Sequence, residues 1–171
     1  MLMVANKLLN FTTFQTNCMQ KVIDSSIEEK ILSLIPQQKP FRFIDEIFEV
    51  NEDFISGCYT FREDEFFYEG HFPGFPVTPG VILTECMAQI GLVAMAIFIL
   101  NQTGEGDENC KTLFTSSEVN FRRMVEPGDK VIVSSTKKYF RMKKLCCDVK
   151  METPAGELIC SGTLSGMFVK E

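Results

Sequence analysis

An apolar run of 20 residues, Val81 to Leu100, constrains the fold of this chain more than any other segment. Pro79-Gly80 precedes the run, and proline is favoured in the first turn of a helix. The apolar residues surround the helical axis, which is typical of a helix enclosed by protein on most sides. Two polar residues within the run, Glu85 and Gln89, are four apart and therefore share one face. We expect a long buried helix with Thr78 as its N-cap.

A run of this length is also long enough to span a bilayer. Glu85 and Gln89 make such a span costly, and no basic flank marks a topology. The pattern therefore favours a helix buried within the protein. Residues 1–10 contain no long apolar region and no small-residue cleavage site, so we expect no signal peptide.

Strand-like segments lie on both sides of the predicted helix. A short helix is expected at Ile27–Ile35, with Ser25 or Ser26 as its N-cap and Pro36 after it. The segments with strand patterns are Phe41–Val50, Phe54–Arg62, Thr112–Phe121, Lys130–Phe140, Lys144–Glu152 and Glu157–Val169. Two strands, one enclosed helix and four further strands predict an α+β sandwich. We expect one domain at 27–171, and a flexible or loosely docked extension at 1–26.

The charge of the chain is distributed unevenly. The net charge of the 171 residues is −6, but residues 1–110 carry −10 and residues 111–171 carry +4. An acidic chain with a local basic region is poorly suited to nucleic acid and better suited to an acidic protein partner. Solvated strand faces around a hairpin turn explain the same residues equally well. The basic residues concerned are Arg122, Arg123, Lys137, Lys138, Arg141, Lys143 and Lys144.

The cysteines indicate a reduced environment. Their number, seven, is odd, and no C-x-x-C pair occurs among them. With one histidine in the chain, this usage favours neither a disulfide framework nor a metal site. Buried thiols in a cytoplasmic protein are the simplest interpretation. Cys86 adjoins Glu85, but neighbours on a helix point about 100° apart, so we do not expect Cys86 to be a nucleophile.

The only histidine, His71, lies in a loop with three glycines and three prolines in eleven residues, 70–80. Glu85 follows it by fourteen residues. Imidazole titrates near neutrality, and burial on an apolar helix raises the pKa of a carboxyl. A site that contains both would have a base and an acid suited to proton transfer. By itself, however, this histidine fits a structural role in the loop at least as well.

Five segments of the chain occur in a characteristic order: Ile35-Pro36 with Pro40–Asp45, Gly70–Gly74, Thr78–Val81, Glu85–Gln89 and Asn120–Asp129. Together they resemble the 3-hydroxyacyl-acyl carrier protein dehydratases of type II fatty acid synthesis, in the branch with Glu on the helix. The resemblance covers roughly residues 31–169. Two departures are Gln37-Gln38, where the family usually has His-Arg, and Phe67-Tyr68-Glu69, where it has Phe-Phe-Gln.

The resemblance implies a hot-dog fold, a long central helix wrapped by a curved antiparallel sheet of about six strands. It implies dehydration of a (3R)-hydroxyacyl thioester to a trans-2-enoyl thioester, in fatty acid or related polyene or lipid biosynthesis, without a cofactor or metal. His71 is then the general base, Glu85 the acid, and the Gly80 N–H the donor to the thioester oxygen. His71 and Glu85 of one site come from different subunits of a homodimer, and a trimer of dimers is left open.

Substrate and partner contacts are expected from the same resemblance. Phe72 and Phe75 are candidates for lining the acyl tunnel. Gln89 either contributes to substrate binding by orienting Glu85 or is a hydrogen-bonded core residue. The phosphopantetheine arm of an acyl carrier protein would enter past the basic residues named above, and no nucleic acid or membrane is involved. Two alternatives are a hot-dog thioesterase that uses Glu85 to activate water, and a non-catalytic subunit that binds acyl thioesters.

Overall fold

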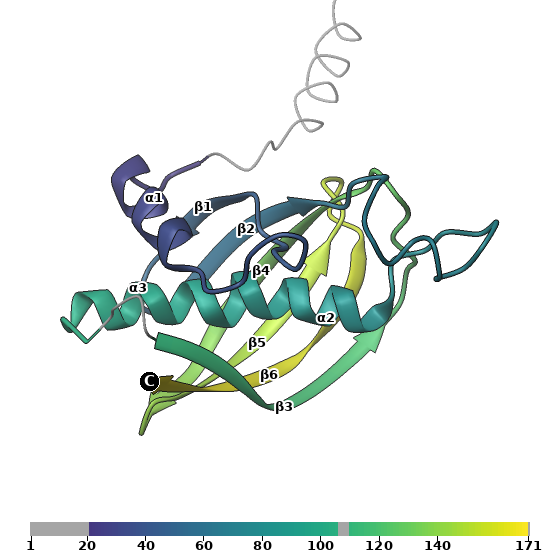
Figure 1. The fold of residues 1–171 in the computed structure, drawn as a ribbon. Coiled ribbons are helices and arrows are strands. Elements are labelled where there is room, and N and C mark those ends of the chain that lie inside the picture. Colours follow the sequence, from purple (N-terminus) through teal and green to yellow (C-terminus); the bar gives the residue numbers. More distant parts are fainter. Residues whose placement is uncertain (1–20, 106–109, 171) are drawn as a thin grey trace, which may run out of the picture.

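A six-stranded antiparallel sheet wraps around one long helix in the computed structural model, which describes residues 21–105 and 110–170 (Figure 1). The strand order is β1-β2-β4-β5-β6-β3, so β1 and β3 form the two edges of the sheet. The strands are β1 (Glu46–Val50), β2 (Phe54–Thr60), β3 (Cys110–Phe121), β4 (Lys130–Arg141), β5 (Lys144–Glu152) and β6 (Leu158–Lys170). The predicted α+β architecture is confirmed.

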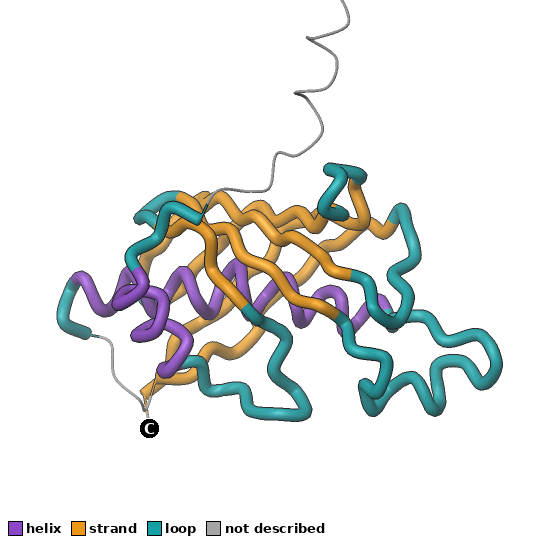
Figure 2. The backbone as a smooth tube through the Cα atoms, turned by 90° about the horizontal axis from the view of Figure 1, so that it is seen from above, coloured by secondary structure: helices purple, strands orange, loops and turns teal. Residues whose placement is uncertain are grey.

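The central helix is continuous over Gly80–Gln102. It consists of α2 (Gly80–Ala88), a π-helical segment η1 (Gln89–Ala94) and α3 (Met95–Gln102). By length and composition it is apolar enough to cross a membrane, but 83% of its most apolar stretch is buried inside the protein. Seen from above, it runs beneath the curved sheet for most of its length (Figure 2). Its apolar surface is therefore accounted for by the core.

The π-helical segment coincides with close contact between the helix and the sheet. The Ser135 hydroxyl on β4 donates to the Gly91 carbonyl at 3.0 Å. A β-carbon at Gly91 would lie 3.0 Å from Ser135 Cβ and 3.2 Å from Val149 Cγ1. A small residue in η1 thus lets the helix lie close to β4 and β5. The sequence pattern predicted the helix but not this change in its winding.

The first helix, α1 (Ser25–Leu34), begins earlier than expected. Its N-cap is Asp24, whose carboxylate accepts from the Ser26 N–H at 2.8 Å. Neither Ser25 nor Ser26 is the cap, because the aspartate one residue upstream supplies the acceptor. The buried Glu28 then joins α1 to β1 by accepting the Ile47 N–H at 3.1 Å. Residues 1–20 of the expected N-terminal extension lie outside the described residues.

Segment 41–45 was expected to belong to the first strand, but β1 begins only at Glu46. The Phe41 carbonyl and the Phe43 N–H are instead bonded to the Gln89 side chain, at 2.9 and 2.6 Å. The Gln89 side chain thus supplies the hydrogen bonds to this backbone that a neighbouring strand would otherwise supply. This exchange fixes segment 41–43 against the central helix, where it helps to build the site described below.

Phenylalanine forms an aromatic cluster next to that segment. The fully buried Phe43 packs edge-on against Tyr59 at 5.5 Å and Phe67 at 6.3 Å between ring centroids. Tyr59 in turn packs against Phe61 at 5.1 Å. The Tyr59 hydroxyl donates to the buried Glu65 carboxylate, so the loop after β2 is anchored by a polar bond as well as by rings. The cluster holds the start of the loop that carries His71.

The β3–β6 pairing depends on glycine at position 162. A β-carbon there would lie 2.0 Å from the Glu118 carbonyl oxygen and 2.8 Å from Val119 Cα. We predict that Gly162→Ala lowers the free energy of unfolding by about 1–3 kcal/mol, because backbone atoms of β3 must move. Urea unfolding measures this change. Gly70→Ala is the control, since nothing lies within 4 Å of a β-carbon there, and an equal loss in both variants would contradict the explanation.

Candidate active site

Glu85 is a partly buried carboxyl on the second turn of α2. Burial raises its pKa above the ordinary glutamate value, and hydrogen bonds from Gln89 and Gln37 oppose that rise in part. Gln89 Nε2 lies 2.8 Å from Glu85 Oε1, and Gln37 Nε2 lies 3.5 Å from the same oxygen. A carboxyl with a raised pKa can retain a proton at a pH where an exposed glutamate has lost it. Glu85 is therefore suited to act as an acid.

The amide of Gln89 fixes which oxygen of Glu85 carries that proton. Gln89 Oε1 accepts from the Phe43 N–H, and Gln89 Nε2 donates to the Phe41 carbonyl. Rotating the amide would place two donors together at one end and two acceptors at the other. Gln89 must therefore present an N–H to Glu85 Oε1, which remains an acceptor. The acidic proton is then carried by Oε2.

Gln89 itself is fully buried and directs all three of its hydrogen bonds to this chain. Its geometry assigns it an orienting role toward Glu85, and it reaches a ligand only through that carboxyl. The two alternatives from the sequence, an orienting residue and a hydrogen-bonded core glutamine, describe the same side chain. The Gln89 amide forms the hydrogen bonds of a buried core residue and also positions the Glu85 carboxyl.

A cavity of about 30 Å³ lies beside Glu85. Its wall includes Gln37, Leu92 and Val93, together with Thr112 and Phe114 of β3. This volume accommodates about one or two groups of the size of water. In the sequence, Gln37 differs from the family pattern but carries no sign of its place beside Glu85, because that place depends on a contact between residues 48 apart.

His71 is positioned by its own loop. Its Nδ1 lies 2.8 Å from the Val77 carbonyl oxygen, which can only accept a hydrogen bond. Nδ1 therefore carries the hydrogen in the neutral ring, and Nε2 keeps a lone pair. The ring stacks on Phe72 at 4.1 Å between centroids and is partly exposed. This is the arrangement that a general base needs: one nitrogen held, the other available.

The loop is tied to the start of the central helix, but not as the sequence predicted. Thr78 was expected to cap the helix, whereas Pro79 is the N-cap residue and provides no side-chain bond. The Thr78 hydroxyl bonds to the Tyr68 hydroxyl at 2.6 Å, and its N–H donates to the Val125 carbonyl. The prediction was wrong because the Thr78 hydroxyl is hydrogen-bonded to Tyr68, whose ring packs against Phe67, and does not cap the helix.

Gly80 is the first residue of α2, where the N–H groups have no acceptor within the helix. The ring of Phe121 from the end of β3 lies over it, and a β-carbon at Gly80 would be 3.1 Å from Phe121 Cζ. A side chain at position 80 would displace that ring. The positive end of the helix dipole adds to the attraction of this N–H for a developing negative charge.

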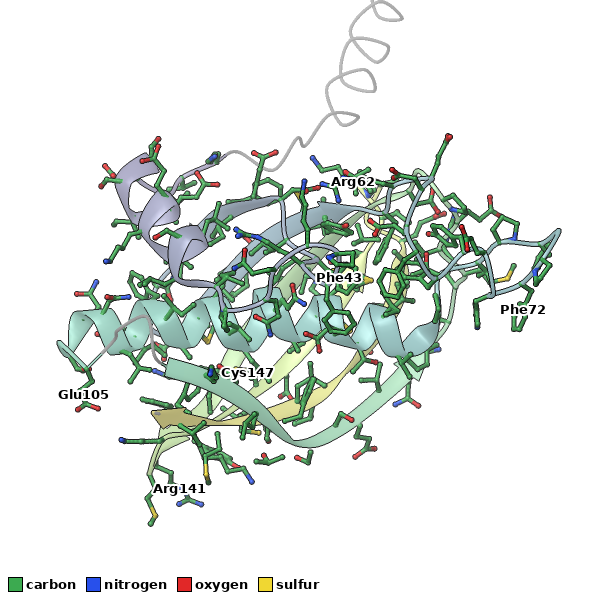
Figure 3. The ribbon with its side chains drawn as sticks, viewed as in Figure 1. Phe43, Arg62, Phe72, Glu105, Arg141 and Cys147 are labelled. Atoms are coloured by element: carbon green, nitrogen blue, oxygen red, sulfur yellow. The ribbon has the colours of Figure 1, made fainter. Side chains whose placement is uncertain are left out.

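Within one chain, the described contacts do not bring the whole set of expected site residues together. Glu85 lines the 30 Å³ cavity, while His71 does not. Phe72 and Phe75 are 53% and 59% exposed and also lie outside the wall of that cavity. In Figure 3 the loop carries Phe72 away from the sheet at one end of the molecule. The exposed rings and imidazole are therefore presented outward.

The basic residues fall into two groups at opposite ends of the sheet. The backbone N–H groups of Arg122 and Arg123 donate hydrogen bonds to the Ile159 carbonyl at the start of β6. Lys144, at the β4–β5 hairpin, pairs with Met167 eight residues further along β6, which corresponds to about 26 Å. Figure 3 shows Arg141 at the end of the molecule opposite Phe72. The seven residues thus do not form one patch.

Ion pairs also differ within the basic set. Lys137 pairs with Asp53 at 3.0 Å and Lys138 with Asp148 at 3.1 Å. Arg123 pairs with the exposed Glu157. Lys137, Lys138 and Arg123 each have an acidic partner within the chain, which reduces the charge that they offer to another protein.

Cys86, the neighbour of Glu85 in sequence, is fully buried, and burial raises the pKa of its thiol, which removes it as a nucleophile.

Comparison with known proteins identifies a family and several related sequences. Residues 35–158 match the family described as FabA-like domain. The 3-hydroxyacyl-acyl-carrier-protein dehydratase FabZ of Caldicellulosiruptor bescii is 36% identical over 140 residues, which cover 80% of this chain and 94% of that protein. The bifunctional enzyme LpxC/FabZ of Porphyromonas gingivalis is 39% identical over 103 residues, which cover 60% of this chain and 21% of that protein.

Solved structures share the fold at low sequence identity. A chain of the dehydratase heterocomplex ApeI:P from Xenorhabdus doucetiae superposes with a TM-score of 0.70 at 14% identity, covering 83% of this chain and 92% of that chain. The thioesterase HI1161 from Haemophilus influenzae gives a TM-score of 0.51 at 18% identity, covering 73% and 78%. Both likenesses concern the fold alone. The hot-dog fold expected from the resemblance is confirmed.

The raised pKa of Glu85 has a consequence for stability. The folded protein retains a proton on Glu85 at pH values where the unfolded chain has lost it, so stability falls as pH rises from the ordinary value of 4.5 through the raised pKa. We predict that Glu85→Gln removes this loss, so that the variant gains in free energy of unfolding relative to the wild type as the pH rises through this window. Urea unfolding at one protein concentration between about pH 4 and pH 8 measures the difference.

The control is Glu105→Gln, which removes an exposed carboxyl after the central helix. A constant difference between wild type and Glu85→Gln at every pH would contradict the assignment of a raised pKa to Glu85.

Proposed function

This chain belongs to the FabA-like domain family, and from that premise we propose that it dehydrates (3R)-hydroxyacyl thioesters on acyl carrier protein to trans-2-enoyl thioesters. The FabZ dehydratases at 35–40% identity support this activity. The observation that carries the proposal is that two side chains each have one atom held by a hydrogen bond and a second atom without a partner among the described residues. In His71 the held atom is Nδ1 and the other is Nε2; in Glu85, whose pKa is raised, the held atom is Oε1 and the other is Oε2.

The proposed elimination uses one group for each proton. His71 Nε2 removes the α-proton, and the electron pair of that C–H bond forms the α–β double bond. The β C–O bond breaks with its electron pair on oxygen, which takes the proton from Glu85 Oε2 and leaves as water. The protonated His71 then returns a proton to Glu85 through solvent, so the enzyme is restored. Each positioned acid or base typically contributes about 10²–10⁴-fold in rate.

Charge that develops on the thioester oxygen needs a donor. We assign this role to the Gly80 N–H, at the start of a helix 23 residues long. Because the donor and Glu85 are separated by little more than one helical turn, one thioester can reach both. The Phe121 ring over Gly80 restricts where the thioester can lie.

We further propose that the working unit is a homodimer in which His71 of one chain serves Glu85 of the other. The strand β3 lies at the edge of the sheet, with Leu113 54% and Phe114 46% exposed. Phe114 also lines the cavity beside Glu85. A second copy placed along β3 would bury these side chains, close the cavity and bring its own His71 loop toward Glu85. A homodimer forms two equivalent sites in this way.

The outward rings of the His71 loop suit the same arrangement. Phe72 and Phe75 would be covered by the partner and would line the acyl tunnel between the two chains. The cysteines at positions 58, 86, 146, 147 and 160 are unpaired and buried. Reduced thiols of this kind support the cytoplasm as the compartment. Formation of further dimers into a trimer of dimers is an extension of the same proposal.

Mixing two inactive variants tests the shared site. We predict that His71→Ala and Glu85→Gln each lower kcat by about 10²–10⁴-fold on a 3-hydroxyacyl thioester. When the two are refolded together, about a quarter of the wild-type activity returns, because half of the dimers are mixed and one of their two sites is intact. Enoyl product is followed by its ultraviolet absorbance. No recovery on mixing would mean that both residues act within one chain.

Product identity separates the dehydratase from its alternatives in the same assay. Release of free thiol without enoyl product would indicate a thioesterase that uses Glu85 to activate water. Binding of an acyl thioester without either product would indicate a non-catalytic subunit. The His71 base is required only by the elimination, so its loss should affect neither alternative strongly.

The separation of the basic residues makes carrier-protein docking testable. Arg122 and Arg123 lie between Phe121, which covers Gly80, and Val125, which bonds Thr78. They are therefore at the end of the molecule where the site opens, and we propose that the acidic carrier protein docks there. We predict that reversing both charges to Glu raises KM for a carrier-bound substrate about tenfold or more and leaves a small N-acetylcysteamine thioester nearly unaffected.

The matched control reverses Lys143 and Lys144 to Glu at the opposite hairpin. A larger effect from this pair than from the arginine pair would place docking at the hairpin instead.

A further inference from the structure

One buried acceptor beside Glu85 has no partner within the described residues. It is Oε1 of Gln37, whose Nε2 lies 3.5 Å from Glu85 Oε1. Buried polar oxygens are hydrogen-bonded in the great majority of proteins, and each exception calls for an explanation. Gln37 lines the same small cavity as Glu85. The acceptor therefore belongs to a side chain that lines the cavity next to the acid.

The two amides beside Glu85 differ in how they are held. Gln89 makes three bonds of 2.6–2.9 Å, which use both of its N–H groups and one lone pair of its carbonyl oxygen. Gln37 makes one long contact and keeps a free acceptor. The polar side chains among the residues that line the cavity are Gln37, Glu85 and Thr112. A hydroxyl group entering the cavity would find a carboxyl whose pKa is raised by burial and one carbonyl oxygen that has no partner among the described residues.

A hydroxyl that leaves as water needs both of these partners. It must receive a proton on a lone pair, and its own hydrogen must be accepted by another group if it is to be fixed in direction. From this match we propose that Gln37 binds the 3-hydroxyl of the substrate, with Oε1 accepting its O–H and turning an oxygen lone pair toward Glu85 Oε2. The inference rests on the proposed function and names the group that recognises the hydroxyl.

The hydrogens remain balanced through the step. The substrate hydroxyl keeps its hydrogen on Gln37 Oε1 while Glu85 Oε2 delivers a second proton to the same oxygen. As the C–O bond breaks, its electron pair stays on that oxygen, and the product is water held by the Gln37 carbonyl. Gln37 neither gains nor loses a proton. It is a substrate-binding residue that orients the leaving group, and the cavity volume of about 30 Å³ suits the water that results.

The same bond gives selectivity. A saturated acyl thioester of equal length leaves Gln37 Oε1 without a partner, so the site favours the hydroxylated chain. Sites that bind a hydroxyl through a buried polar group discriminate strongly against analogues that lack it. Selection at this point would operate before chemistry, because it depends on binding alone.

A pair of unreactive analogues tests the inference without turnover. We use a 2,2-difluoro-3-hydroxyacyl pantetheine thioester, which has no α-hydrogen to lose, and the same compound without the hydroxyl. For the wild type, calorimetry should show tighter binding of the hydroxylated analogue. We expect Gln37→Met to reduce that preference about five- to tenfold while the affinity for the deoxy analogue stays within about twofold. Gln37→His, which keeps a neutral acceptor nitrogen, should restore part of the preference.

The control variant is Gln38→Met. Gln38 Nε2 donates to the Ile35 carbonyl at 3.2 Å, and Gln38 does not line the cavity. Its preference for the hydroxylated analogue should equal that of the wild type. An equal loss of affinity for both analogues in Gln37→Met would show a purely structural role and overturn the inference, as would an unchanged preference.

Failure of this inference is distinguishable from failure of the proposed function. A wild type that produces enoyl thioester while Gln37→Met keeps its full preference refutes only the role of Gln37. A wild type that prefers the hydroxylated analogue but releases thiol refutes the dehydratase and leaves hydroxyl recognition by Gln37 supported.

Discussion

The hydrogen bonds of the Gln89 side chain connect the fold of this protein to its chemistry. One amide replaces a strand partner for Phe41 and Phe43, and its remaining N–H reaches Glu85 at 2.8 Å. Because both ends of the amide are committed to backbone groups, its orientation is not adjustable. The acid is therefore set by the same contacts that attach segment 41–43 to the central helix. Loss of that attachment would release the carboxyl and the aromatic cluster around Phe43 together.

Much of this arrangement could be predicted from the sequence because periodicity reports burial. The apolar run with Glu85 and Gln89 on one face predicted the enclosed helix, and the strand bounds at Lys144–Glu152 match the structure. Contacts between distant segments could not be predicted in this way. Three features depend on contacts between residues that no local pattern relates. They are the start of the first strand only at Glu46, the hydrogen bond of Thr78 to Tyr68, and the Gln37–Glu85 contact. The basic residues are the clearest example. Arg122 and Lys144 are 22 residues apart in the sequence, yet they lie beside opposite ends of β6.

The placement of His71 follows a different logic from that of Glu85. Glu85 is held by the core, whereas His71 is held by its own loop through Val77 and is partly exposed. A proposed base on a loop at one end of the molecule and a proposed acid beside a cavity are compatible with a site completed by a second copy of the chain. The edge position of β3 and the exposure of Leu113 and Phe114 beside the cavity are consistent with that arrangement. The shape of one chain thus supports a site divided between two.

The two titratable groups are also prepared in opposite ways, and this matters for an elimination that moves one proton on and one proton off the enzyme. Burial raises the pKa of Glu85, and the fixed amide of Gln89 leaves Oε2 as the oxygen that carries the proton in the acid form. The Val77 carbonyl keeps a hydrogen on Nδ1 of His71 and leaves Nε2 to accept. Neither state requires a metal or another charged residue in contact with the group. The direction of proton transfer is therefore set by the Val77 carbonyl and the buried Gln89 amide, and neither of these groups titrates.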